Sequence, residues 1–155
     1  LSQLNPFRSE SDDKEQARIV KGLKYSFLYI SGMAGKKLKK KLIDEQEIIL
    51  NLSILLQEAY VGDTALLKIR KLKAMPNADK NKLVIQAQMV QLYLYEALEK
   101  SRKAALEAIA SFSKGSEKRR HTKMVNRMLK PYDINPKTLR RNIAQAVIER
   151  GGYEL

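Results

Sequence analysis

The run from Asp44 to Lys73 constrains the fold of this chain more than any other stretch. Its apolar residues recur three or four positions apart, which is the spacing of one helix face and not the alternation of a strand. The main stripe consists of Ile48, Leu52, Leu55, Ala59, Leu66 and Ile69, with Gly62 in the gap, and it is widened by Ile49, Leu56, Tyr60 and Leu67. A helix this long and this apolar is not stable alone, so we expect the rest of the chain to cover it.

Periodicity and capping residues predict this central helix and four others. Asp44 suits the N-cap position, and Glu47 three residues later completes a capping box. Apolar spacing predicts the further helices over residues 13–41, 79–113, 116–130 and 135–149. Short connections between the first three favour antiparallel neighbours. We therefore expect an all-α fold, an up-down bundle of three long helices plus two short C-terminal helices.

The other helix ends carry start and stop signals of their own. The candidate N-caps are Ser11 or Asp12, Asp79, Ser116 and Asn135, the last followed by Pro136. Gly115 suits the left-handed position that ends a helix, and Gly151 is expected to end the last one.

Small residues in the first predicted helix have two interpretations. Gly22, Ser31, Gly32 and Gly35 are poor helix formers, and each glycine costs about 1 kcal/mol relative to alanine. Either they let another helix approach closely, or a long and otherwise well-packed helix tolerates them.

Length and composition favour one helical domain. The chain has 155 residues and no cysteine, which excludes disulfide scaffolds and thiolate metal sites. We expect residues 1–11 to be a linker from an upstream domain and residues 12–155 to form a single bundle. Because the chain starts at Leu1 rather than Met, we expect it to be a piece of a longer polypeptide. No apolar run approaches the ~20 residues of a membrane span.

The formal net charge is +13, and the excess lies at the two ends of the chain. Residues 1–41 carry ten cations against four acids, and residues 114–155 carry eleven against four. Such a charge favours anionic partners. It supports an alternative function as a basic helical nucleic-acid-binding protein, because EKRRHTK and the two short helices could imitate a helix-turn-helix. Nucleic acid is nevertheless the weaker candidate, since the cations spread over several faces and no binding motif is present.

The densest positive charge is a lysine run at the end of the first predicted helix. The run consists of Lys36, Lys37, Lys39, Lys40 and Lys41. Cations stabilise a helix C-terminus, so a solvated helix end explains the run. The same five lysines could instead contact an anionic surface such as a membrane, and we keep both interpretations.

Few residues could carry catalysis or bind a metal. His121 is the one histidine, and among so many cations we expect an exposed side chain rather than a metal ligand. Asp63 and Asn51 lie near the apolar face of the central helix, and we expect Asp63 to cap a helix or pair with a Lys or Arg rather than act as a base. No phosphate-binding loop or nucleophile motif is present. The sequence thus assigns no catalytic, cofactor-binding or metal-binding residue.

The central run resembles the C-terminal extension of acyl-CoA dehydrogenases of the very-long-chain type and their longer bacterial relatives. The chain's final segment is similar to the end of that extension, most of all at residues 148–152, IERGG. In the central run the match is carried by Glu45, Gln46, Glu47, Ile49, Leu52, Tyr60, Leu66 and Leu67.

This resemblance implies a non-catalytic C-terminal domain of a FAD-dependent oxidoreductase of fatty acid β-oxidation. FAD, the acyl-CoA site and the glutamate base would lie upstream, so the chain alone would be inert and hold no cofactor. Its expected partners are its own upstream dehydrogenase domains, a second copy of the parent, an anionic membrane surface and an electron-transfer flavoprotein. The expected location is cytoplasmic, with peripheral contact to the inner face of the membrane. An isolated domain of this kind should expose apolar surface.

Overall fold

The structure, a computed structural model, describes residues 10–152, and every regular element in that range is helical. The elements are α1 Glu10–Leu38, the 3-10 helix η1 Lys39–Asp44, α2 Gln46–Lys73, α3 Lys80–Phe112, α4 Gly115–Met128 and α5 Pro136–Arg150. The prediction of three long helices and two short ones is confirmed. The predicted linker over residues 1–11 lies almost wholly outside the described residues, and α1 already begins at Glu10.

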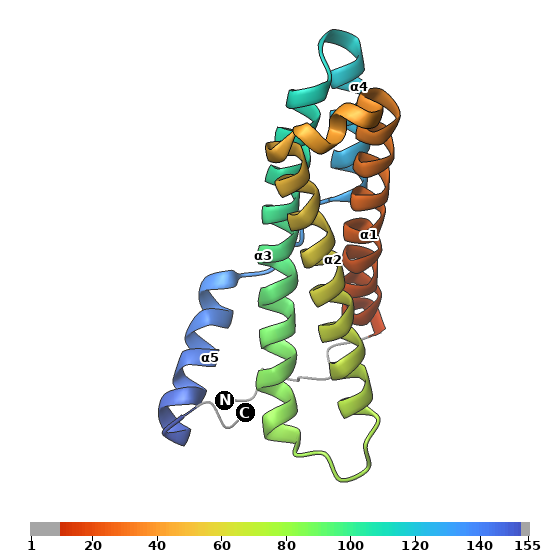
Figure 1. Ribbon diagram of the computed structural model, residues 1–155. Coiled ribbons are helices and arrows are strands. Elements are labelled where there is room, and N and C mark those ends of the chain that lie inside the picture. Colours follow the sequence, from red (N-terminus) through yellow and green to blue (C-terminus); the bar gives the residue numbers. More distant parts are fainter. Residues whose placement is uncertain (1–9, 153–155) are drawn as a thin grey trace.

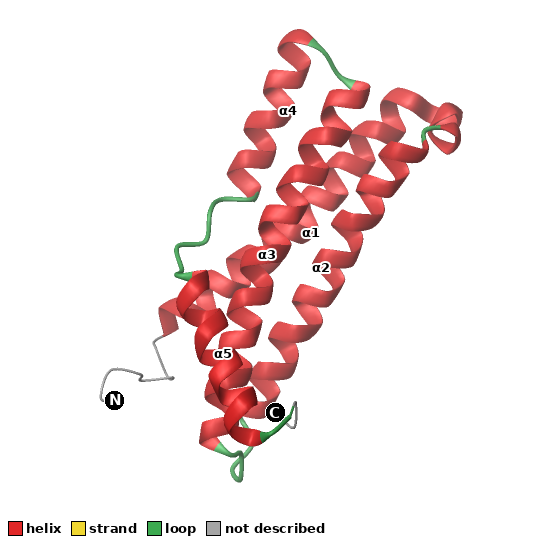
Figure 2. Ribbon diagram, turned by 90° about the vertical axis from the view of Figure 1, so that its left-hand side faces the viewer, coloured by secondary structure: helices red, strands yellow, loops and turns green. Residues whose placement is uncertain are grey.

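The three long helices run up, down and up along one another (Figure 1). α2 packs between α1 and α3, and α1 also contacts α3. α4 returns beside α1 and the upper half of α3, whereas α5 lies along the lower half of α3 (Figure 2). Among the described helices α5 contacts α3 alone. The up-down bundle is therefore built from α1, α2 and α3. The two short helices pack on its outside, α4 against α1 and α3 and α5 against α3.

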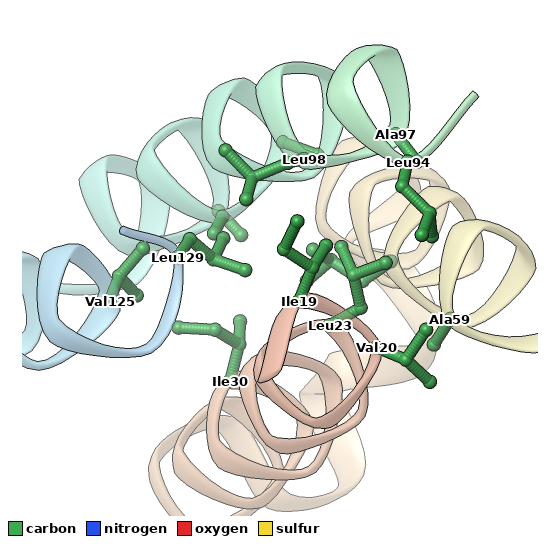
Figure 3. Packing of buried hydrophobic residues seen from close by; sticks show 14 of the residues in the cluster. Ile19, Val20, Leu23, Ile30, Ala59, Leu94, Ala97, Leu98, Val125 and Leu129 are labelled. Carbon is green, nitrogen blue, oxygen red and sulfur yellow. The ribbon is translucent and has the colours of Figure 1, made fainter. Parts of the chain in front are cut away.

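The core lies where the predicted stripe of α2 meets α1 and α3. Five of the six predicted stripe residues are fully buried, and Leu52 is partly buried. Figure 3 shows side chains of α1, α3 and α4 converging on this core. Those labelled there include Ile19, Leu23, Ile30, Leu94, Leu98, Val125 and Leu129. Their burial, at about 1.5–3 kcal/mol for each large aliphatic side chain, holds the bundle together.

The predicted widening of the α2 stripe is wrong as a description of the core. Leu56, Tyr60 and Leu67 are each half or more exposed, and Ile49 is only partly buried. In a helix these positions point about 100° away from Ile48, Leu55, Ala59 and Leu66. The two neighbours α1 and α3 cover only one arc of α2, so this second apolar row remains outside the core.

Several helix ends differ from the sequence expectations. Residues 39–44 form η1, so Asp44 is not the N-cap of α2. Glu45 is the N-cap instead, and its side chain makes no capping hydrogen bond. α1 ends at Leu38 rather than Lys41, because Lys39 adopts a left-handed φ of 52°. α4 begins at Gly115, also left-handed, so Ser116 is not its N-cap.

Other predicted ends are confirmed. The Asp79 carboxylate accepts hydrogen bonds from the backbone N–H groups of Asn81 at 2.9 Å and Lys82 at 3.2 Å. The Asn135 side chain accepts one from the N–H of Thr138 at 3.2 Å, and Gly151 ends α5 in the left-handed region. The first helix is different, because α1 begins at Glu10 and Asp12 lies inside it.

The glycines of α1 divide between the two interpretations. Gly22 is buried where α1 meets the end of α4, and a Cβ there would collide with the carbonyl oxygen of Met128. At Gly32 and Gly35 a Cβ would meet nothing within 4 Å. Close helix approach therefore explains Gly22, whereas Gly32 and Gly35 are merely tolerated.

Candidate functional site

Buried polar side chains are the first candidates for a catalytic or metal-binding site in this bundle. In the range 10–152 no group of three or more His, Asp or Glu side chains is arranged to hold a metal ion. None of the helices described for this chain is long and apolar enough to cross a membrane. His121 and Glu58, two buried polar side chains discussed below, each have a partner on a neighbouring helix.

His121 is buried, and the expectation of an exposed histidine is wrong. The ring is 2% exposed, and its Nδ1 shares a hydrogen bond of 2.7 Å with the Tyr29 hydroxyl. The rings of Tyr29 and Phe112 lie 5.7 and 6.0 Å away. Nε2 has no hydrogen-bond partner and lies 3.7 Å from a carboxylate oxygen of Glu117. The cations around it in sequence point outward, while His121 and Val125, four residues apart, form the inner face of α4.

Asp63 forms an ion pair on the surface between α1 and α2, as predicted. Its carboxylate lies 2.8 Å from the ammonium group of Lys24. A second pair, between Arg70 and Asp13 at 2.8 Å, joins the same helices nearer the lower end. The hydrogen bond from Arg70 lowers the pKa of Asp13. Asn51 is buried in the bundle. These ion pairs join α1 to α2, and the carboxylates of Asp63 and Asp13 are both paired with cations.

Glu58 is a buried carboxylate that the sequence analysis missed. One carboxylate oxygen accepts a hydrogen bond of 2.7 Å from the Tyr93 hydroxyl, and the other accepts one of 2.5 Å from the ammonium group of Lys100. Burial, and next the hydrogen bond to Glu58, raise the pKa of Tyr93. The signal in the sequence is the position of Glu58 three residues after Leu55, within the buried arc of α2. This cluster joins α2 to α3.

The lysine run lies at the upper end of the bundle, where α1 passes into η1. All five lysines are exposed. Lys37 pairs with Glu117 at the start of α4, which places the run beside the α3–α4 turn. Ile43 follows the run and is 73% exposed, an unusual state for a large aliphatic side chain. The structure thus gathers the predicted residues on one end, next to an apolar side chain.

An apolar surface runs along the outside of α1 and α2. It consists of Leu28, Leu56, Tyr60 and Leu67, and we call it the α1/α2 apolar face. Leu28 is one turn beyond Lys24, and Tyr60 is one turn before Asp63. Because Lys24 and Asp63 are paired across antiparallel helices, Leu28 and Tyr60 lie on the same side. Tyr60 is 71% exposed and Leu28 is 61% exposed. Such a row is typical of an interaction site.

Comparison with known proteins identifies where this bundle occurs. A family model described as "Acyl-CoA dehydrogenase, C-terminal domain" matches residues 22–127, from the middle of α1 almost to the end of α4. A "Probable acyl-CoA dehydrogenase" of Bacillus subtilis (strain 168) is 28% identical over 160 residues, which cover 99% of this chain and 26% of that protein.

A solved structure has the same fold. It is an acyl-CoA dehydrogenase from Bacillus anthracis, complexed with FAD, with a TM-score of 0.83 and 23% sequence identity. The match covers 90% of this chain and 24% of that one. The chain thus spans about a quarter of the length of either relative. The alternative of a nucleic-acid-binding protein finds no support in these matches.

Proposed function

Because the chain belongs to the acyl-CoA dehydrogenase C-terminal domain family, we propose that it serves as the non-catalytic C-terminal domain of a FAD-dependent acyl-CoA dehydrogenase of fatty acid β-oxidation. The family match over α1 to α4 is the observation that carries this proposal. FAD, acyl-CoA and the catalytic base would belong to the remaining three quarters of such a polypeptide. Residues 1–11 would link the two parts, and residues 12–155 would form the accessory domain.

The α1/α2 apolar face is the surface that would cover the upstream domains. Its four large apolar side chains are each half or more exposed. Completing their burial would contribute roughly 1 kcal/mol apiece, or about 4 kcal/mol for the face. That is enough to hold a tethered domain in place, because a covalent link supplies a high effective concentration. The same packing would support the homodimer of the parent.

The lysine run is the surface that would face an anionic partner. Each lysine close to an anionic bilayer contributes about 1 kcal/mol, and the exposed Ile43 could enter the interface. We propose peripheral contact with the inner face of a membrane through Lys36, Lys37 and residues 39–41. An acidic surface of an electron-transfer flavoprotein is the second candidate. A solvated helix end, without any anionic partner, is the alternative, and the acids Asp44, Glu45 and Glu47 follow the run directly.

The proposed function is tested on the full-length polypeptide. Its visible spectrum is recorded, and a long-chain acyl-CoA is added in the absence of oxygen. Loss of the flavin absorbance is expected, since the substrate would reduce FAD, whereas this chain alone should be colourless. A full-length protein that remains colourless and unreactive after FAD is added would contradict the assignment.

A further inference from the structure

The outward side of α4 carries a dense row of positive charge that the proposed function does not use. Five cations line a hollow of about 500 Å³, with Thr122 and Asn126 between them. We call this surface the α4 basic face, and its cations are Lys118, Arg119, Lys123, Arg127 and Lys130. All five are exposed, and no acid lines the hollow. The polar groups of this surface are therefore cations and neutral hydrogen-bonding groups, carried on the apolar stems of the long side chains.

Most of the positive charge of this face has no acidic partner among residues 10–152. In the part of the chain that the structure describes, none of the five cations forms an ion pair. Glu117 is the one acid of α4, and it pairs with Lys37 and approaches His121 on the side toward α1. Lys130 lies near enough to Glu15 to help lower the pKa of that carboxyl. The other four cations have no ion-pair partner in the described part of the chain.

The arrangement also costs α4 stability. Arg119, Lys123 and Arg127 are spaced four apart, and like charges at that spacing destabilise a helix by about 0.2–0.5 kcal/mol per pair. Lys118 and Arg119 lie close to the helix N-terminus, where the helix dipole disfavours cations. A local rule broken without compensation inside the fold is typical of a functional surface.

The bundle holds α4 in a fixed orientation. On its inner side His121 contacts Tyr29, and α1 meets the end of α4 at Gly22 without an intervening side chain. At the same end the Arg102 guanidinium of α3 donates to the carbonyl oxygen of Leu129. A helix fixed at its middle and at its C-terminal end presents its outer face as a preorganised surface, which lowers the entropy cost of binding.

The shape and composition of the face select the class of partner. From Lys118 to Arg127 it extends for about 14 Å along α4, at ~1.5 Å per residue, and Lys130 follows beyond the end of that helix. It has no aromatic side chain on which a nucleic-acid base could stack. A shallow strip one helix wide fits a single polypeptide segment better than a flat bilayer. Arginine pairs with carboxylates through two parallel hydrogen bonds, and Thr122 and Asn126 can add neutral ones.

We propose that the α4 basic face binds an acidic polypeptide segment, rich in Asp and Glu, from a partner protein. A helical segment of about ten residues matches the helical part of the face. The partner's carboxylates would pair with Arg119, Lys123 and Arg127. This proposal is independent of flavin chemistry and of the lysine run.

The test uses the full-length polypeptide and a fluorescent helical peptide with Glu at every fourth position. Binding is followed by fluorescence anisotropy at increasing salt. In the variant R119E/K123E/R127E the affinity should fall roughly tenfold or more relative to the unchanged protein. The matched control K71E/K80E/K82E changes the net charge equally at the far end of the bundle and should bind almost normally. Equal losses in both variants would mean that only net charge attracts the peptide, and would overturn the proposal.

Two further measurements make the test specific. The variant R119Q/K123Q/R127Q keeps strong helix formers at the three positions, and circular dichroism checks that it folds. It should show an intermediate loss of peptide affinity. Normal peptide affinity of this variant would overturn the proposal. Vesicles containing phosphatidylserine and a DNA duplex are compared with the peptide. Binding of either through the α4 basic face, without binding of the peptide, would assign the face to another partner class.

Discussion

At the scale of single residues, the clearest constraint is a glycine without room for a side chain. Gly22 lies where the backbones of α1 and α4 meet, and the obstacle is the carbonyl oxygen of Met128 rather than a movable side-chain end. Gly32 is ten residues further along the same helix and faces open space. The two positions therefore form a matched pair.

We predict opposite effects of alanine at these two positions. Gly22→Ala should lower the free energy of unfolding by about 2 kcal/mol or more, because the two helices must separate. Gly32→Ala should raise it by about 0.5–1 kcal/mol through helix propensity alone. Urea denaturation of both variants checks the prediction. Equal stabilities of the two would mean that α4 does not pack on α1 as described.

The buried Glu58 cluster gives a second prediction at this scale. Tyr93→Phe removes a hydrogen bond to a buried carboxylate and should lower the free energy of unfolding by about 1.5–3 kcal/mol. Tyr60→Phe removes the same atom from an exposed side chain and should change it very little. Thermal denaturation of the two variants distinguishes the sites, and equally small effects would contradict a buried Glu58–Tyr93 bond.

The same cluster should give the folded state a pH dependence in alkali. The pKa of Tyr93 is raised on folding, so the folded chain holds that proton more tightly than the unfolded chain does. The resulting stabilisation is complete below the unfolded pKa, about 10, and is lost as pH rises toward the folded value. Tyr93→Phe should therefore reduce the alkaline loss of stability.

At the scale of elements, the sequence predicted where the helices lie better than it predicted which side of each helix is covered by other helices. Apolar spacing identified the buried stripe of α2 because a single helix has one fixed period. It could not show which arc α1 and α3 would cover, so Leu56 and Tyr60 were assigned to the same buried face. The prediction that His121 is exposed was wrong for the same reason, because burial depends on tertiary packing rather than on neighbouring charges.

Local chemistry explains which helix ends were predicted. Asp79 and Asn135 act through hydrogen bonds within three residues, so sequence alone indicates them. The prediction that Asp44 is the N-cap of α2 was wrong because Asp44 is the last residue of η1, the 3-10 helix that joins α1 to α2. The lysine run was located correctly as exposed residues at a helix end. The α4 basic face was missed because the hollow becomes visible only when α4 has an inner and an outer side.

The exposed row on α2 predicts self-association of this chain when it is isolated. Leu56→Gln with Leu67→Gln should shift the protein toward the monomer in sedimentation experiments while changing its stability little, because both side chains already face solvent. Leu50→Gln is the matched control, since Leu50 is 62% exposed on another side of α2. If the control variant dissociated equally well, the α1/α2 apolar face would not be the contact.

At the scale of the whole molecule, the bundle has a buried apolar core and three distinct surfaces, one apolar and two basic. The α1/α2 apolar face would dock on upstream domains, the lysine run occupies one end, and the α4 basic face lies on a flank. Buried polar residues such as Glu58 and His121 hold helices together. In the proposed function, this domain would act by contact and leave catalysis to the rest of the polypeptide.

The most direct test measures whether the α1/α2 apolar face is covered in the full-length polypeptide. Because this chain has no cysteine, Tyr60→Cys introduces its only thiol, and Leu50→Cys provides an exposed control. Maleimide labelling rates of each variant, located by peptide mass spectrometry, are compared between the isolated chain and the full-length protein. We expect Tyr60→Cys to react rapidly in the isolated chain and slowly in the full-length protein, and Leu50→Cys to react rapidly in both. Equal rapid labelling of Tyr60→Cys in both would contradict this expectation.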